Sequence, residues 1–112
     1  MEWSSGKYPE KLVVAMKNFS TVFSAWHEDE LVGLVCAMDD GIMNVYIHYI
    51  LVKPKHQLKG VGRELLERVK SHYKDYLKIV VVTEQSISRF YEYSGFEKKD
   101  GKCVLFISDL ED

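Results

Sequence analysis

The feature that most constrains the fold of this chain is a strand-like run that passes through a short basic loop into an amphipathic helix. Residues 45–52 carry enough β-branched and aromatic side chains to form a buried strand. Apolar residues then recur at helical spacing, at Leu65, Leu66, Val69 and Tyr73. The loop between them contains Gly60 and Gly62 and joins the C-terminal end of the strand to the N-terminus of the helix. Such a junction offers unpaired backbone N–H groups and a positive dipole end, which suit an anionic phosphate.

The glycine spacing in this loop excludes two common nucleotide-binding patterns. A P-loop needs a lysine and a hydroxyl residue after its last glycine, but Arg63 and Glu64 follow Gly62. The dinucleotide-binding fingerprint needs a third glycine at the position that Leu65 holds. The loop therefore belongs to another kind of site.

The composition limits the class of protein. The 112 residues are 46% hydrophobic and 29% charged, which predicts one globular domain over residues 1–112. A net charge of −2 gives no basic surface for nucleic acid, and no apolar run is long enough to cross a membrane. Cys36 and Cys103 lie in apolar runs, which predicts buried free thiols and a cytoplasmic location. The histidines and cysteines lack metal-ligand spacing, so no metal site is predicted.

Periodicity and turn residues predict the element order α, β, β, β, α, β, α, β, β. Helices are expected at residues 9–18 and 61–72, and from an N-cap at Ser86 to Tyr93, where Gly95 ends the helix. Strands are expected at residues 22–26, 31–38, 45–52, 79–83, 96–98 and 103–107. This order predicts an α/β (α+β) fold with helices on the faces of a mixed sheet.

Two motifs in this chain occur together in one known family. Gln57-Leu58-Lys59-Gly60-Val61-Gly62 has the pattern [RQ]-x-x-G-x-[GA], and Val52-x-Pro54 precedes it. Phe90-Tyr91-Glu92-Tyr93-Ser94-Gly95-Phe96 has the pattern F-Y-x-x-x-G-F. In this order they resemble the GNAT superfamily of N-acetyltransferases, over roughly residues 31–112. The resemblance implies a mixed, mostly antiparallel sheet flanked by helices. The usual first strand and helix are expected to be missing, because few residues precede Pro9.

The resemblance implies that the loop binds acetyl-CoA. In the family, the loop amides hold the coenzyme A pyrophosphate, and the preceding strand splays from its neighbour and pairs with the pantetheine arm. The implied cofactor-binding residues are Ile50, Leu51, Val52, Gln57, Leu58, Lys59, Gly60, Val61, Gly62 and Arg63. Positive charge gathers nearby at Lys53, Lys55, His56, Lys59 and Arg63, although ordinary solvated loops also carry such runs.

Two catalytic residues are predicted. Tyr91 falls on the family tyrosine whose hydroxyl often protonates the leaving thiolate, and a tyrosine pKa of about 10 suits that role. His48 is the titratable residue on the strand before the loop, and a pKa of about 6.5 suits a general base. For both residues the alternative is a packing role. Several relatives have an acid where Tyr49 stands and many have an asparagine where Glu84 stands, so neither of those family contacts carries over.

The predicted function is acetyl-CoA-dependent N-acetyl transfer to a primary amine of a small molecule or peptide. The alternative is a catalytically weak or inactive acyl-CoA-binding or regulatory module, and a plain interaction module is a third possibility. A missing first strand would leave residues 22–26 as an exposed sheet edge. That edge predicts a homodimer.

Overall fold

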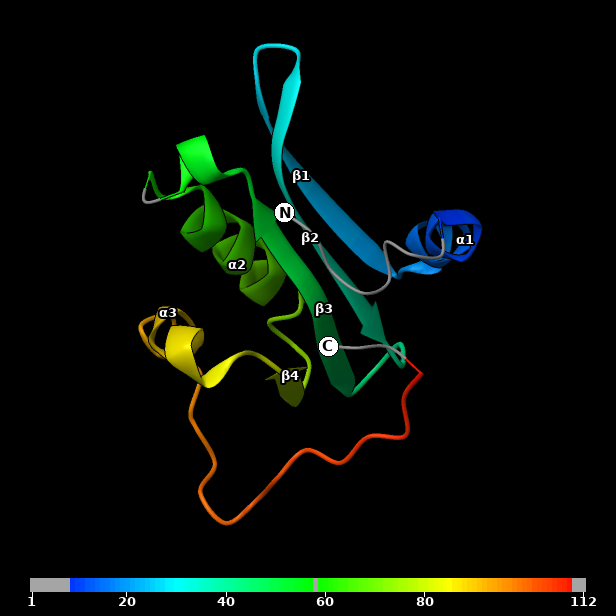
Figure 1. Cartoon of the computed structure of the whole chain (residues 1–112). Helices are drawn as coiled ribbons and strands as arrows, with labels where there is room; N and C mark the ends of the chain where they lie inside the picture. Colours follow the sequence, from blue (N-terminus) through cyan, green and yellow to red (C-terminus); the bar gives the residue numbers. More distant parts are fainter. Residues whose placement is uncertain (1–8, 58, 110–112) are drawn as a thin grey trace.

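The computed structural model describes residues 9–57 and 59–109, and it shows a four-stranded sheet with helices beside it (Figure 1). The helices are α1 (Pro9–Asn18), α2 (Val61–His72) and α3 (Ser88–Glu92), with short 3-10 turns η2 (Pro54–His56) and η3 (Gln85–Ile87). The strands are β1 (Thr21–His27), β2 (Glu30–Asp39), β3 (Asn44–Val52) and β4 (Lys78–Val81). The order of these elements follows the prediction as far as α3.

The sheet is mixed and mostly antiparallel, as predicted. Its strand order is β1-β2-β3-β4; the first three strands pair antiparallel, and β3 pairs with β4 in parallel. Short turns suffice for the antiparallel pairs, whereas a parallel pair needs a long crossover. Helix α2 supplies that crossover and lies against one side of the sheet (Figure 1).

The core lies between α2 and the sheet. Leu66 and Val69 of α2 pack with Val35 and Ile47 of the sheet, and the exposed fraction of all four is 0%. Full burial of such a side chain stabilises a fold by about 1.5–3 kcal/mol. Gly33 lets α2 approach, because a Cβ there would lie 3.1 Å from Val61 Cγ1. The start of α2 is therefore fixed against the sheet.

The two C-terminal strands expected at residues 96–98 and 103–107 are not formed. Phe96 packs on the core and donates its N–H to the Tyr91 carbonyl at 3.1 Å, but the segment after it runs away from the sheet (Figure 1). The exposed fractions of Val104, Leu105, Phe106 and Ile107 are 52%, 87%, 71% and 107%. An apolar run favours a strand but supplies no neighbouring strand to pair with, and pairing is what makes a strand.

Three smaller expectations also need correction. β4 ends at Val81 instead of Thr83. Ser86 does not cap the short helix, because a 3-10 turn with a hydrogen bond from Ile87 N–H to the Glu84 carbonyl takes its place, and α3 begins at Ser88. Gly95 follows α3 at φ 97°, as a residue that ends a helix should. Cys36 is buried, but Cys103 is exposed because its segment is unpaired.

Candidate active site

β3 separates from β4 halfway along its length. The β3–β4 ladder ends at the pair Ile47–Val81, whereas β3 itself continues to Val52. The separation begins at a β-bulge, where Cys36 of β2 pairs with Tyr49 and Ala37 with Ile47, so that His48 is the extra residue. A bulge increases local twist and turns a strand from its neighbour. Within the described parts of the chain, no strand pairs with the β4 side of residues 48–52.

The backbone groups that face this open edge follow from the hydrogen bonds of the other edge. Lys53 donates its N–H to the Val32 carbonyl at 2.8 Å, so it faces β2, and by alternation Leu51 does too. The N–H and C=O groups of Ile50 and Val52 therefore point to the open edge. Gln57 Nε2 donates to the Val52 carbonyl at 3.0 Å and folds the loop back onto the end of β3. Ile50, Leu51 and Val52 were all predicted to bind the coenzyme through their main chain. Leu51 is the one of the three whose main-chain groups point toward β2 instead.

The loop enters α2 through a left-handed glycine. Gly60 has φ 85°, and its carbonyl accepts the first helical hydrogen bond, from Glu64 N–H at 3.0 Å. The N–H groups of Val61, Gly62 and Arg63 lie in the first turn, where a helix supplies no acceptor. Apart from its two chain neighbours, no described residue has an atom within 4 Å of the position that a Cβ on Gly60 would take. Leu58 lies outside the described residues.

Gly62 brings the tyrosine helix to the loop. A Cβ at Gly62 would lie 3.2 Å from Phe90 Cζ, so a larger residue would push the Phe90 ring of α3 away from the start of α2 by a few tenths of an ångström. Packing against Phe90 is therefore sufficient reason for a glycine at position 62. The sequence motifs 57–62 and 90–96 thus meet in space.

Tyr91 occupies the core beside the end of β4. Its exposed fraction is 7%, and its ring lies 5.0 Å from that of Phe90 and 5.8 Å from that of Phe96. Burial raises the pKa of Tyr91, and a hydrogen bond with the Thr83 side chain acts in the opposite direction. Thr83 lies two residues after the end of β4, the strand that diverges from β3. Tyr91 is therefore a protonated phenol at neutral pH.

His48 lies at the other end of the open edge from the loop, within an aromatic cluster. Its ring is 4.0 Å from that of Tyr49 and 5.5 Å from that of Phe19, and its Nδ1 is 3.4 Å from the Tyr46 hydroxyl. The side chain is half-buried. The bulge explains its position, because the extra residue of a bulge is left out of the ladder and its side chain is re-aimed.

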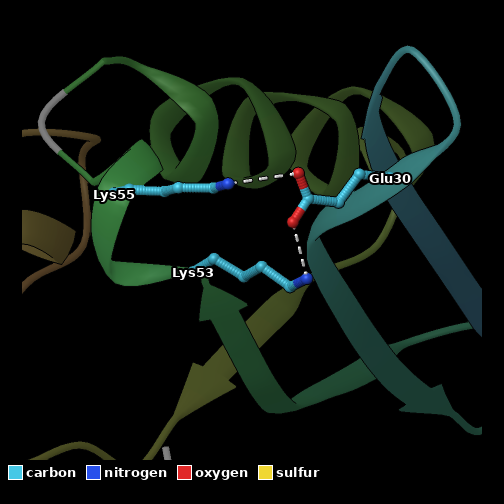
Figure 2. Close-up of polar contacts among 3 residues, drawn as sticks. All are labelled: Glu30, Lys53 and Lys55. Carbon is cyan, nitrogen blue, oxygen red and sulfur yellow. Dashed lines mark hydrogen bonds and ion pairs between the residues drawn. The ribbon is translucent and has the colours of Figure 1, made fainter.

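The five basic side chains of the loop region are not equivalent. Lys53 and Lys55 bind Glu30 of β2, at 2.9 Å and 3.4 Å, and Figure 2 shows the carboxylate between them. Lys59 and Arg63 are exposed and make no ion pair with any described residue. Glu30 was not predicted from the sequence, because nothing local links it to residues more than twenty positions away.

His56 completes the basic group and lies beside the β1–β2 turn. Its ring is 5.7 Å from that of His27. The pKa of His56 is lowered, first by loss of solvent and then by the charge of Lys59. Across the described ranges, no group of three or more His, Cys, Asp or Glu side chains is placed to hold a metal ion. None of the helices described is long and apolar enough to span a membrane.

Comparison with known proteins identifies the family. A family model described as acetyltransferase (GNAT) domain matches residues 3–104. The chain belongs to the GNAT acetyltransferase family. The resemblance predicted from residues 57–62 and 90–96 is confirmed. A curated relative, an uncharacterised N-acetyltransferase of the lysA 3′ region of Bacillus methanolicus, is 28% identical over 71 residues, and the match covers 59% of each chain. The matched region thus spans less than two thirds of that relative's length.

Solved structures agree with this assignment. A GNAT family acetyltransferase from Streptococcus pneumoniae has a TM-score of 0.80 at 26% identity, and the match covers 89% of this chain and 80% of that one. A protein of unknown function and probable acetyltransferase from meticillin-resistant Staphylococcus aureus has a TM-score of 0.83 at 18% identity, covering 94% and 85%. The likeness confirms the predicted fold class.

Proposed function

We propose that this GNAT protein transfers an acetyl group from acetyl-CoA to a primary amine of a small molecule or peptide. The observation that carries the proposal is the open edge of β3, which runs beside the glycine loop and the tyrosine helix. An extended amide-containing arm pairs with a strand edge as another strand does. A pyrophosphate suits the first turn of α2, where N–H groups and the helix dipole point outward.

Two parts of the site hold the acetyl donor: the glycine loop with the first turn of α2, and the main chain along the open edge of β3. The N–H groups of Val61, Gly62 and Arg63 bind the pyrophosphate, and the side chains of Lys59 and Arg63 add positive charge. The main chain of Ile50 and Val52 binds the pantetheine arm. Gln57 acts indirectly, because its side-chain amide is bound to the Val52 carbonyl and shapes the loop.

The remaining residues move protons. His48 accepts a proton from the ammonium form of the acceptor, directly or through water, and the neutral amine attacks the thioester carbonyl. The carbon–sulfur bond then breaks, and the leaving thiolate takes the proton of the Tyr91 hydroxyl. The nitrogen became positively charged in the attack, and it now gives up a second proton, which leaves a neutral amide and returns Tyr91 to its phenol form. The raised pKa of Tyr91 keeps the phenol protonated at neutral pH, so its proton is present when the thiolate leaves.

Acetyl-CoA binding and turnover test the proposal separately. Acetyl-CoA at a hundred times its dissociation constant should stabilise the protein by about 2.7 kcal/mol, measured by thermal shift. The double variant Lys59→Glu with Arg63→Glu should lose this shift, whereas Lys74→Glu should keep it, because Lys74 is exposed in the turn after the C-terminal end of α2. Release of free coenzyme A thiol on an amine panel then measures transfer, and mass spectrometry identifies the acetylated product.

Each outcome has a clear meaning. No thermal shift with saturating acetyl-CoA would overturn the proposal. A shift without thiol release on any amine would support the alternative of a binding or regulatory module, which the burial of Tyr91 favours.

We further propose that the protein acts as a homodimer in the cytoplasm.

A further inference from the structure

The loop that we propose to hold the coenzyme is tied from outside by the β1–β2 hairpin. Glu30 is the first residue of β2, and the two oxygens of its carboxylate bind different lysines: Oε2 binds Lys53 and Oε1 binds Lys55 (Figure 2). These lysines flank Pro54, where the chain leaves β3 and enters η2. One carboxylate thus fixes the first turn of the loop at two points.

Two further contacts join the same parts. The Lys53 N–H donates to the Val32 carbonyl, which continues the β2–β3 ladder past the end of β3. At the tip of the hairpin, the ring of His27 lies 5.7 Å from that of His56 at the end of η2. On its inner side, the loop is held by Gln57 on the Val52 carbonyl. The β1–β2 hairpin therefore contacts the loop on the side away from the open edge of β3, and the opposite side of the loop faces that edge.

We propose that Glu30 is a positioning residue for coenzyme binding, which holds the glycine loop in its binding conformation through Lys53 and Lys55. This inference rests on the proposed function, because it assumes that the loop binds the coenzyme. Glu30 itself does not touch the coenzyme. The side chains of Glu30, Lys53 and Lys55 are 38%, 51% and 68% exposed, so the ion pairs are screened and their effect is modest.

The sign of one substitution separates this role from plain electrostatics. Glu30→Gln keeps the shape of the side chain and removes one negative charge near an anion site, which by Coulomb attraction alone tightens anion binding. If Glu30 instead holds the loop in its binding conformation, Glu30→Gln weakens anion binding. We expect Glu30→Gln to weaken acetyl-CoA binding by about two- to tenfold by isothermal titration, with kcat unchanged and KM for acetyl-CoA raised. Unchanged or tighter binding would overturn the proposal.

Two further measurements complete the test. Glu97→Gln removes a carboxylate of an exposed ion pair with Lys99 outside the site and should leave the affinity unchanged. At 1 M salt the Debye length is about 3 Å, so the affinities of wild type and Glu30→Gln should converge. Hydrogen exchange of the amides in residues 53–57 should be faster in Glu30→Gln without any ligand, and equal exchange would overturn the brace. A wild-type protein that binds no acetyl-CoA would instead refute the proposed function.

Discussion

Gly60 and Gly62 are two residues apart and have different physical reasons to be glycine. Gly60 has a left-handed backbone that other residues adopt only with strain. Gly62 lies against the ring of Phe90. In the pattern G-x-G, the first glycine therefore meets a requirement of the backbone and the second a requirement of packing. The packing requirement joins the loop to α3.

The packing requirement at Gly62 predicts the effect of a single methyl group. Gly62→Ala places its Cβ 3.2 Å from Phe90 Cζ, closer than packed atoms normally lie. Overpacking of this kind costs about 1–3 kcal/mol, which urea unfolding would measure. The smaller side chain in Phe90→Leu should relieve the contact, so the added cost of Gly62→Ala should fall in that background. An equal cost in both backgrounds would show that Phe90 is not the cause.

Tyr91 predicts a catalytic effect that its neighbour Tyr93 should not show. Tyr91→Phe removes the hydroxyl that we propose as the proton donor, so kcat should fall by roughly a hundredfold or more while acetyl-CoA affinity is kept. The lost hydrogen bond with Thr83 should cost about 1 kcal/mol of stability. Tyr93→Phe is the control, because Tyr93 follows the same helix and is 75% exposed. Equal turnover in wild type and Tyr91→Phe would leave Tyr91 only a packing role.

At the scale of elements, the β2–β3 turn is held by one carboxylate. Asp40 Oδ1 accepts the N–H groups of Ile42, Met43 and Asn44 at 3.0, 2.7 and 3.0 Å. These hydrogen bonds, the one from Asn44 first, hold the pKa of Asp40 well below its usual range. A lowered pKa in the folded state means that the ionised form stabilises the fold. This turn sets the register in which β3 meets β2.

The pH dependence of this turn can be stated with its sign. The contribution of Asp40 is fully present above its unfolded pKa of about 3.9 and is lost as pH falls toward the folded value. Asp40→Asn should therefore lower the urea midpoint at pH 7, and the gap from wild type should narrow below about pH 4. Asp75→Asn, exposed after α2, is the control. A gap that stays constant from pH 7 to pH 3 would contradict the assignment.

The elements that local sequence predicts well are those whose ends have a local cause. α2 begins after Gly60 and ends at His72 as expected. Both signals that predict it, the glycine before it and the apolar residues at helical spacing, lie within or next to the helix itself. The strand at residues 103–107 was wrong because pairing depends on a distant neighbour. Glu30 was missed for the same reason, since its lysines belong to another element. Sequence motifs were enough to find the loop and Tyr91 of the candidate site. The contact of Glu30 with Lys53 and Lys55 could be found only once the fold was known.

At the scale of the whole molecule, one side of the sheet and the C-terminal segment leave apolar surface uncovered. Among the strands of residues 9–57 and 59–109, β1 is a sheet edge, as the sequence predicted, and Val22 and Trp26 on it are 44% and 60% exposed. Residues 104–107 expose four apolar side chains in succession. Contiguous apolar surface of this kind marks an interaction site. An exposed edge strand also offers unpaired backbone groups to another chain.

These surfaces argue for pairing of two copies along β1. Sedimentation equilibrium at micromolar concentration should then give a dimer for the wild type. Val22→Lys places a charge on the edge, which blocks strand pairing, and should give a monomer. Val13→Lys is the matched control, because Val13 is 54% exposed on α1 and lies off the edge, so this variant should remain dimeric. A wild-type monomer would refute the dimer, and a dimeric Val22→Lys would move the contact away from β1, to the other uncovered surface at residues 104–107.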